Sequence, residues 1–130
     1  MPPTATALES LDRSWTVLLT TFKRDGTAVP TPVNLAIEDQ RGYLRTYSKA
    51  WKTKRIRNNP EVEIAPSTFR GKPTGRSMRA TARLLAGDED AHARGVIERR
   101  HPLFKRYLIP GLHKISRYTT LHYEVRFVDA

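Results

Sequence analysis

The sequence has 130 residues, a length that predicts one domain over residues 1–130 with enough chain for a hydrophobic core. It carries 23 lysines and arginines against 13 acidic residues, and the net charge of +10 indicates an anionic partner: nucleic acid, a phosphate-bearing cofactor, a polyanionic tail or a membrane surface. The chain has no cysteine, which excludes disulfides, thiolate metal sites and cysteine nucleophiles and is typical of an intracellular protein.

The first residues, MPPTATALESLD, lack the apolar run of a signal peptide, and no apolar stretch approaches the ~18 residues of a membrane span. We therefore expect a cytoplasmic protein without a membrane span.

The first half of the chain predicts short strands joined by tight turns. In chain order, the expected elements are a helix over 7–13, a strand over 15–22, a turn over 23–26, a strand over 29–37, a turn over 38–42 and a strand over 43–47. Asp25-Gly26 between two strand-like runs is a strong hairpin signal. Pro30 and Pro32 predict that the second strand is bulged or lies at an edge, because proline cannot donate to a strand ladder.

The second half predicts strands mixed with helices. The expected elements are a helix over 51–58, strands over 61–65 and 78–85, a loop over 70–75, helices over 88–100 and 102–116, and a last strand over 119–128. Asn59-Pro60 ends the first of these helices, because the residue before proline avoids the α region. Three acidic residues, 88–90, begin the next helix, where the helix dipole favours them.

These patterns predict a mainly β fold, a six-stranded antiparallel split β-barrel with a few short peripheral helices. Tight turns favour antiparallel pairing, and closure into a barrel removes the sheet edges. The alternation of apolar residues predicts a core made of Val17, Leu19, Val33, Leu35, Leu44, Val62, Ile64, Ala80, Ala82, Leu84, Leu121, Tyr123 and Val125.

The segment 46–60 is the strongest functional signal. Residues 49–57 hold five basic side chains and no acidic one, with Tyr47 and Trp51 nearby. Lys52 falls at the start of a predicted helix, where backbone N–H groups already attract phosphate, and Arg55 shares roughly its face. Thr46 and Ser48 would add hydroxyl donors. A solvated helix face is the alternative interpretation.

The segment 31–34, Thr31, Pro32, Val33 and Asn34, is a second candidate. Its prolines leave backbone groups free to meet the edge of a ligand, although protection of an edge strand against aggregation explains them equally.

The four histidines, by contrast, show no metal-ligand spacing, and we expect no metal site. His101 and His113 lie in basic surroundings, which favours the surface, and His122 has the opposite parity to the core, which favours exposure or an interface. The sequence contains no paired-carboxylate motif, nucleophile elbow, Walker loop or dinucleotide fingerprint. The catalytic residues therefore stay unknown at this stage.

The ordered run DGTAVPTPVNLAIEDQRGYLRTYSKAWKTKRIRNNPEVEIAPSTFRG resembles the pyridoxamine-phosphate-oxidase-like split-barrel flavoproteins. It is most similar to their actinobacterial branch of reductases that depend on the deazaflavin coenzyme F420. The resemblance covers residues 15–85 best, and the segment HPLFKRYLIPGLHKI is similar to one subgroup. It implies a split barrel that forms a homodimer, with the cofactor in a groove at the dimer interface.

The resemblance also implies roles for individual residues. Thr46 and Lys52 occupy the positions that hold the cofactor phosphate in the family, and residues 31–34 those that line the ring. The oxidases carry Ser-Arg-Lys where this chain has Ala50-Trp51-Lys52, which favours coenzyme F420 over flavin mononucleotide (FMN). Possible replacements for the missing pair are Ser48, Lys49, Lys54 and Arg55. A surface suited to the polyglutamate tail of F420 would comprise Lys49, Lys54, Arg55, Arg57, Arg76 and Arg79.

The function implied by the resemblance is hydride transfer from reduced F420 to an electrophilic small molecule such as an activated alkene, an enone or a quinone-like compound. Three alternatives stay open: an FMN-binding oxidoreductase, a carrier of a flavin or tetrapyrrole without turnover, and a basic nucleic-acid-binding module. We expect no nucleic acid partner, because no nucleic-acid-binding motif is present.

Overall fold

The computed structural model describes residues 5–14, 16–47, 51–101 and 120–128. The described part contains the helices α1 (Ala5–Arg13), α2 (Trp51–Asn58) and α3 (Gly87–Arg100). Its strands are β1 (Thr16–Phe22), β2 (Ala28–Val33), β3 (Leu35–Glu38), β4 (Arg41–Tyr47), β5 (Glu61–Ser67), β6 (Met78–Leu84) and β7 (Thr120–Phe127). The helix expected over 102–116 lies outside the described residues.

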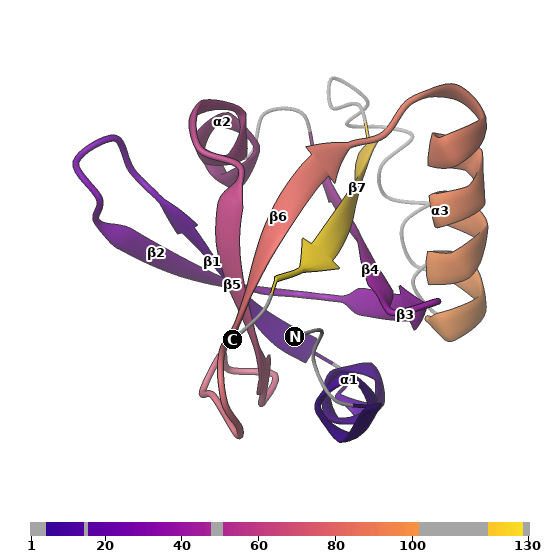
Figure 1. Ribbon diagram of the computed structural model, residues 1–130, viewed down its shortest axis with the longest axis horizontal. Coiled ribbons are helices and arrows are strands. Elements are labelled where there is room, and N and C mark those ends of the chain that lie inside the picture. The colour runs from indigo at the N-terminus through magenta and orange to yellow at the C-terminus, as the bar shows by residue number, and fades with distance from the viewer. Residues whose placement is uncertain (1–4, 15, 48–50, 102–119, 129–130) are drawn as a thin grey trace.

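The strands form one curled antiparallel sheet in the order β2-β1-β5-β6-β7-β4-β3 (Figure 1). Its two outermost strands, β2 and β3, follow each other in the chain with only Asn34 between them. The sequence predicted six strands, and this number is wrong, because the described residues form seven. The difference arises because the strand expected over 29–37 is divided at Asn34, where the chain leaves the β1 ladder and joins the β4 ladder.

The turns that connect the strands follow the local chemistry of the sequence. Between β1 and β2, Gly26 adopts φ +89°, and the Asp25 carboxylate accepts a hydrogen bond of 2.9 Å from the backbone N–H of Thr27. Between β3 and β4, Asp39 and Gln40 both have positive φ, at 52° and 65°, which is the pattern of a two-residue type I′ hairpin. This turn is shorter than the five residues expected. The prediction that prolines mark an edge strand is confirmed, because β2 ends the sheet order.

The main core fills the concave side of the sheet. Eleven of the thirteen predicted core residues are buried there, namely Val17, Leu19, Val33, Leu35, Leu44, Val62, Ile64, Ala80, Ala82, Tyr123 and Val125. Leu11 of α1 and Ile56 of α2 join them. Leu121 is half-buried and packs against this core. The prediction for Leu84 is wrong: it is the last residue of β6 and is 52% exposed, and its neighbour Leu85 is buried instead.

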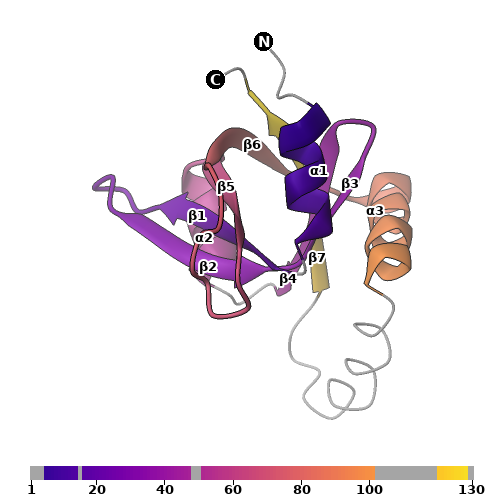
Figure 2. The same ribbon diagram turned by 90° about the horizontal axis from the view of Figure 1, so that it is seen from below.

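A second, smaller core lies on the outer face, where α3 covers β3, β4 and β7 (Figure 2). It consists of Ala36, Tyr43, Leu85, Ala93, Val96 and Ile97. Both faces of β7 are therefore covered. Of the two expectations for His122, exposure or an interface, exposure is wrong, because its side chain is fully buried and contacts Asp90 of α3. The expectation that His101 lies at the surface is also wrong: this residue follows α3 and is fully buried, with its ring nitrogen Nε2 3.0 Å from the carbonyl oxygen of Leu35.

The helix α1 is tied to the far end of α3. The guanidinium of Arg100 donates to the carbonyl oxygen of Asp12 through both Nε, at 3.0 Å, and one terminal nitrogen. In the described part of the chain, no helix is long and apolar enough to cross a membrane.

Candidate functional site

The helix α2 forms where the sequence predicts it and presents the basic segment. It packs on β1 through its buried side, which carries Thr53 and Ile56. Asn59 ends it: its backbone N–H donates to the carbonyl of Arg55 at 2.8 Å, and its side-chain oxygen accepts from the N–H of Glu61 at 3.1 Å. The lysines and arginines of α2 are thereby held on one short, firmly anchored element.

Thr46 is next to last in β4, and four residues separate it from this helix. It pairs with Leu121 of β7, and its side chain is 1% exposed. Within the described residues, no hydrogen-bond partner reaches its hydroxyl oxygen. A buried hydroxyl without a partner costs about 1–3 kcal/mol, so such groups normally occur where a ligand or an ordered water completes them.

Lys52 occupies the first turn of α2 and is half-buried. Burial, assisted by the charge of Arg55, lowers the pKa of its ammonium group. It forms no ion pair with a carboxylate within the described part of the chain. Lys52 is thus a partly desolvated cation that an anionic ligand would stabilise.

Arg55 is anchored in the wall of the barrel. Its Nε donates a hydrogen bond of 2.7 Å to the hydroxyl of Thr21, a fully buried residue of β1. This bond fixes the guanidinium on the side of α2 that faces the β1–β2 hairpin.

A basic pocket opens between this side of α2 and the hairpin. It has a volume of about 350 Å³ and is lined by Phe22, Lys23, Arg24, Lys54, Arg55 and Asn58. The structure therefore brings Lys54 and Arg55 of the predicted site together with Lys23 and Arg24, which the sequence analysis treated only as turn residues. Their basic character was visible in the sequence, but their position beside α2 depends on how the hairpin folds back.

The other predicted site residues that the structure describes do not line the basic pocket. Thr31, Pro32 and Val33 lie on β2, and Asn34 follows it; Val33 belongs to the core, whereas Pro32 is exposed. Arg76 and Arg79 are exposed on and beside β6 and do not line the basic pocket. Ser48 and Lys49 lie outside the described residues.

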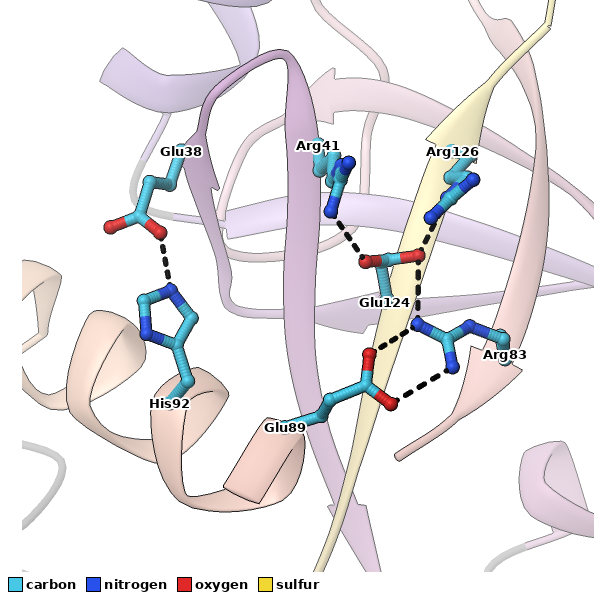
Figure 3. Close-up of polar contacts among 7 residues, drawn as sticks. All are labelled: Glu38, Arg41, Arg83, Glu89, His92, Glu124 and Arg126. Atoms are coloured by element: carbon cyan, nitrogen blue, oxygen red, sulfur yellow. Dashed lines mark hydrogen bonds and ion pairs between the residues drawn. The ribbon is translucent and has the colours of Figure 1, made fainter. Parts of the chain in front are cut away.

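A second charged pocket lies on the opposite side of the molecule, between α3 and the outer face of the sheet (Figure 3). It has a volume of about 340 Å³, and Glu38, Asp39, Arg41, Tyr43, Leu85, Asp88, Glu89, His92 and Glu124 line it. Sequence reasoning missed this cluster, because its members are scattered over β3, β4, β7 and α3.

Glu124 is the centre of this cluster. Its buried carboxylate is contacted by Arg126 at 2.8 Å and by Arg41 and Arg83 at 3.4 Å, and Arg83 also binds Glu89. Burial alone would raise the pKa of Glu124, but the hydrogen bond and charge of Arg126, with the charge of Arg83, outweigh it and lower that pKa. The cluster is largely self-neutralised, which is what a buried carboxylate requires.

The side chain of His92 completes this pocket. Its Nε2 contacts the carboxylate of Glu38, and its ring meets Tyr43 edge-on with centroids 5.9 Å apart. Within the described residues, no group of three or more potential ligands could hold a metal ion.

No protein-family model and no curated protein matches this sequence. Solved structures do match its fold, and the pyridoxamine 5′-phosphate oxidase type is among them. A protein of this type from Listeria innocua superposes with a TM-score of 0.66 at 13% identity, over 95% of this chain and 92% of its own. An F420-H2-dependent reductase gives 0.61 at 17% identity, over 86% of this chain and 94% of its own.

A third structural neighbour is the heme storage protein HutZ of Vibrio cholerae, with a TM-score of 0.66 at 14% identity, over 100% of this chain and 93% of its own. At these identities the likeness establishes the fold: a mainly β, antiparallel, curled split-barrel sheet with a few helices. The F420-H2-dependent reductase and the heme storage protein differ in ligand, so the shared fold alone assigns no ligand to this chain.

Proposed function

We propose that this protein is an oxidoreductase that binds reduced coenzyme F420 and passes a hydride to an electrophilic small molecule such as an activated alkene, an enone or a quinone-like compound. The proposal includes a homodimer with the cofactor groove at its interface. FMN is the alternative cofactor on the same site.

The proposal rests on two residues that lie six positions apart in the chain, Thr46 and Lys52. One offers a buried hydroxyl without a partner among the described residues, and the other a half-buried ammonium without a carboxylate. Both flank the start of α2, where backbone N–H groups favour an anion. A phosphate is an anion that each of these groups can bind, and both candidate cofactors carry one.

The basic pocket supports F420 over FMN. Four cations line this one opening: Lys54 and Arg55 from α2, the helix of Lys52, and Lys23 and Arg24 from the β1–β2 turn. FMN ends at its phosphate, whereas F420 continues into a chain of carboxylates that such an opening would suit. The replacement of Ser-Arg by Ala50-Trp51 before Lys52 is in keeping with this preference.

When bound, the reduced deazaflavin supplies the hydride; the protein supplies binding, orientation and electrostatics. In this proposal, Thr46 and Lys52 hold the phosphate end, and residues 31–34 lie along the ring. Hydride addition to an enone leaves negative charge on an oxygen, which nearby cations stabilise. The proton that completes the reaction comes from solvent, because the proposal assigns no acid residue.

The decisive experiment is a fluorescence titration of the purified protein with F420 and, separately, with FMN. We expect binding of F420 at micromolar or lower concentration, and a loss of about tenfold in Lys52→Ala, which corresponds to ~1.4 kcal/mol. The matched control is Arg13→Ala, which removes an equal charge from an exposed position at the end of α1. Equal losses in both variants, or none in Lys52→Ala, would remove Lys52 from the site.

A carrier of a flavin or tetrapyrrole without turnover is the second candidate, favoured by the heme-storing neighbour. His101 and His122 are fully buried and hydrogen-bonded within the protein, so neither is placed to ligate a heme. Reduction of a cyclic enone by the F420-loaded protein would exclude the carrier. A nucleic-acid-binding module would instead be supported by two results. The affinity for single-stranded nucleic acid would fall steeply with salt concentration, and the protein would bind neither cofactor.

A further inference from the structure

A buried chain of three side chains joins α3 to the outer face of the sheet. His122 of β7 is fully buried, with Nδ1 2.8 Å from the carboxylate of Asp90 on α3. On its other side, Nε of Arg45 donates to His122 Nε2 over 3.0 Å. Because the guanidinium has only donors, Nε2 must be the acceptor, and the ring proton must sit on Nδ1 and point to Asp90. The geometry therefore requires a neutral ring.

The same chain continues back to α3. The guanidinium of Arg45, whose side chain is almost completely buried, lies 3.5 Å from the carboxylate of Glu98. Asp90 and Glu98 are eight residues apart, about two helical turns, and so share one face of α3. His122 and Arg45 together thus hold α3 to β7 and β4 at two points.

A proton added to His122 would break the hydrogen bond between its Nε2 and Arg45. Nε2–H would face the N–H of Arg45, donor against donor, with two positive charges buried together. Arg94 of α3 adds a third cation close to the ring, and it already shares Asp90 through a contact of 3.4 Å. The charged groups around the ring are therefore Arg45 from β4 and Asp90 and Arg94 from α3, with Glu98 reached through Arg45.

We propose that His122 is a proton-operated latch: the neutral ring fastens α3 to the sheet, and uptake of a proton expels Arg45 from the ring and loosens α3. The helix also forms one wall of the charged pocket through Asp88, Glu89 and His92, so its loosening opens that pocket. Burial lowers the pKa of His122 more than the hydrogen bond to Asp90 raises it, so the latch releases below the ordinary histidine value of 6.5.

The test is hydrogen exchange of the α3 amides in the full-length protein from pH 7.5 to pH 5, corrected for intrinsic rates. We expect the amides of residues 87–100 to lose protection several-fold at pH 5. The amides of β1 and β5 should keep their protection. In His122→Gln the side-chain carbonyl still accepts from Arg45 and does not titrate, so most of the pH-dependent loss of protection disappears. His92→Gln is the control, because His92 lies on α3 and is half-exposed. This variant should lose as much protection of α3 at pH 5 as the wild-type protein does.

The protonation state of the ring is measured independently by the nitrogen chemical shifts of His122 in the wild-type protein. We expect the Nδ1–H tautomer at pH 7.5 and a titration midpoint that coincides with the loosening of α3. An Nε2–H tautomer, an α3 that loosens equally in His122→Gln, or a midpoint that does not match would overturn the latch. The wild-type titration decides the question even if the variant does not fold.

Discussion

At the scale of single residues, a substitution of Thr46 should affect stability and cofactor binding in opposite directions. Replacing it with valine keeps the shape and removes a hydroxyl that, among the described residues, has no partner. Because that hydroxyl is buried at a cost, we expect Thr46→Val to leave the free energy of unfolding unchanged or to raise it by about 1 kcal/mol. If the hydroxyl meets the cofactor phosphate, the same variant binds F420 more weakly. Denaturant unfolding and cofactor titration measure the two effects, and a destabilised variant would mean that the hydroxyl has a structural partner.

Glu124 has the opposite character, because its carboxylate is buried and fully engaged. Glu124→Gln leaves Arg41, Arg83 and Arg126 around a neutral amide. The three guanidinium groups are about half-exposed, so water compensates part of the loss, and we expect a destabilisation of about 1–3 kcal/mol. Glu89→Gln, which removes one exposed partner of Arg83, serves as the control and should cost less stability than Glu124→Gln, because water screens an exposed ion pair.

The site residues that sequence reasoning reached are those that follow one another in the chain. Lys52, Lys54 and Arg55 stand out because a single helix carries them. Lys23 and Arg24 of the basic pocket, and all of the cluster around Glu124, belong together only after the hairpin and α3 have folded back onto the sheet. Spacing along the chain predicts local sites; contacts across distant elements need the topology.

At the scale of elements, the same limit explains the errors in the core. Alternation predicted correctly which residues of β1, β5 and β6 face inward, apart from Leu84, because each strand has one clearly apolar face. It misplaced His122, because the rule that residues of opposite parity face solvent holds only for a sheet with one covered face. The helix α3 covers the second face of β7, and polar residues there are accommodated by pairing with Arg45 and Asp90. The division of 29–37 at Asn34 likewise depends on a change of partner strand.

Two glycines in different elements give opposite expectations for the same substitution. In β4, a Cβ on Gly42 would lie 2.5 Å from Val125 Cγ2 and 3.0 Å from Leu35 Cδ1, too close for either buried neighbour. We expect Gly42→Ala to lose about 1–3 kcal/mol of stability. In α3, a Cβ on Gly95 would meet only the flexible end of Arg99 at 3.4 Å, so Gly95→Ala should gain about 0.5–1 kcal/mol of helix stability.

Chemical denaturation of both variants measures this pair. The double variant Gly42→Ala with Val125→Ala shows whether the clash is the cause, because removing the Val125 methyl groups should make the added Cβ less costly than it is alone. If Gly42→Ala destabilises the protein equally in the wild-type and Val125→Ala backgrounds, the strand backbone and not the clash is the cause.

At the scale of the whole molecule, the buried titratable groups predict a loss of stability in two stages as the pH falls. Burial lowers the pKa of both His101 and His122 below the ordinary value of 6.5. The unfolded chain then binds protons first, so the free energy of unfolding falls as the pH drops below 6.5 and stops falling once the folded histidines are also protonated.

The second stage belongs to carboxylates. The pKa of Glu124 lies below the ordinary value of 4.5, because the hydrogen bond and charge of Arg126 outweigh the effect of burial. The pKa of Glu89 is also lowered, mainly by its hydrogen bond to Arg83. Their contribution is complete above 4.5 and is lost as the pH falls through the folded values. Urea unfolding at half-unit steps from pH 7.5 to pH 3.5 should therefore show two declines. The variant His101→Gln with His122→Gln should remove the first and keep the second, whereas a first decline of unchanged size would assign it to other groups.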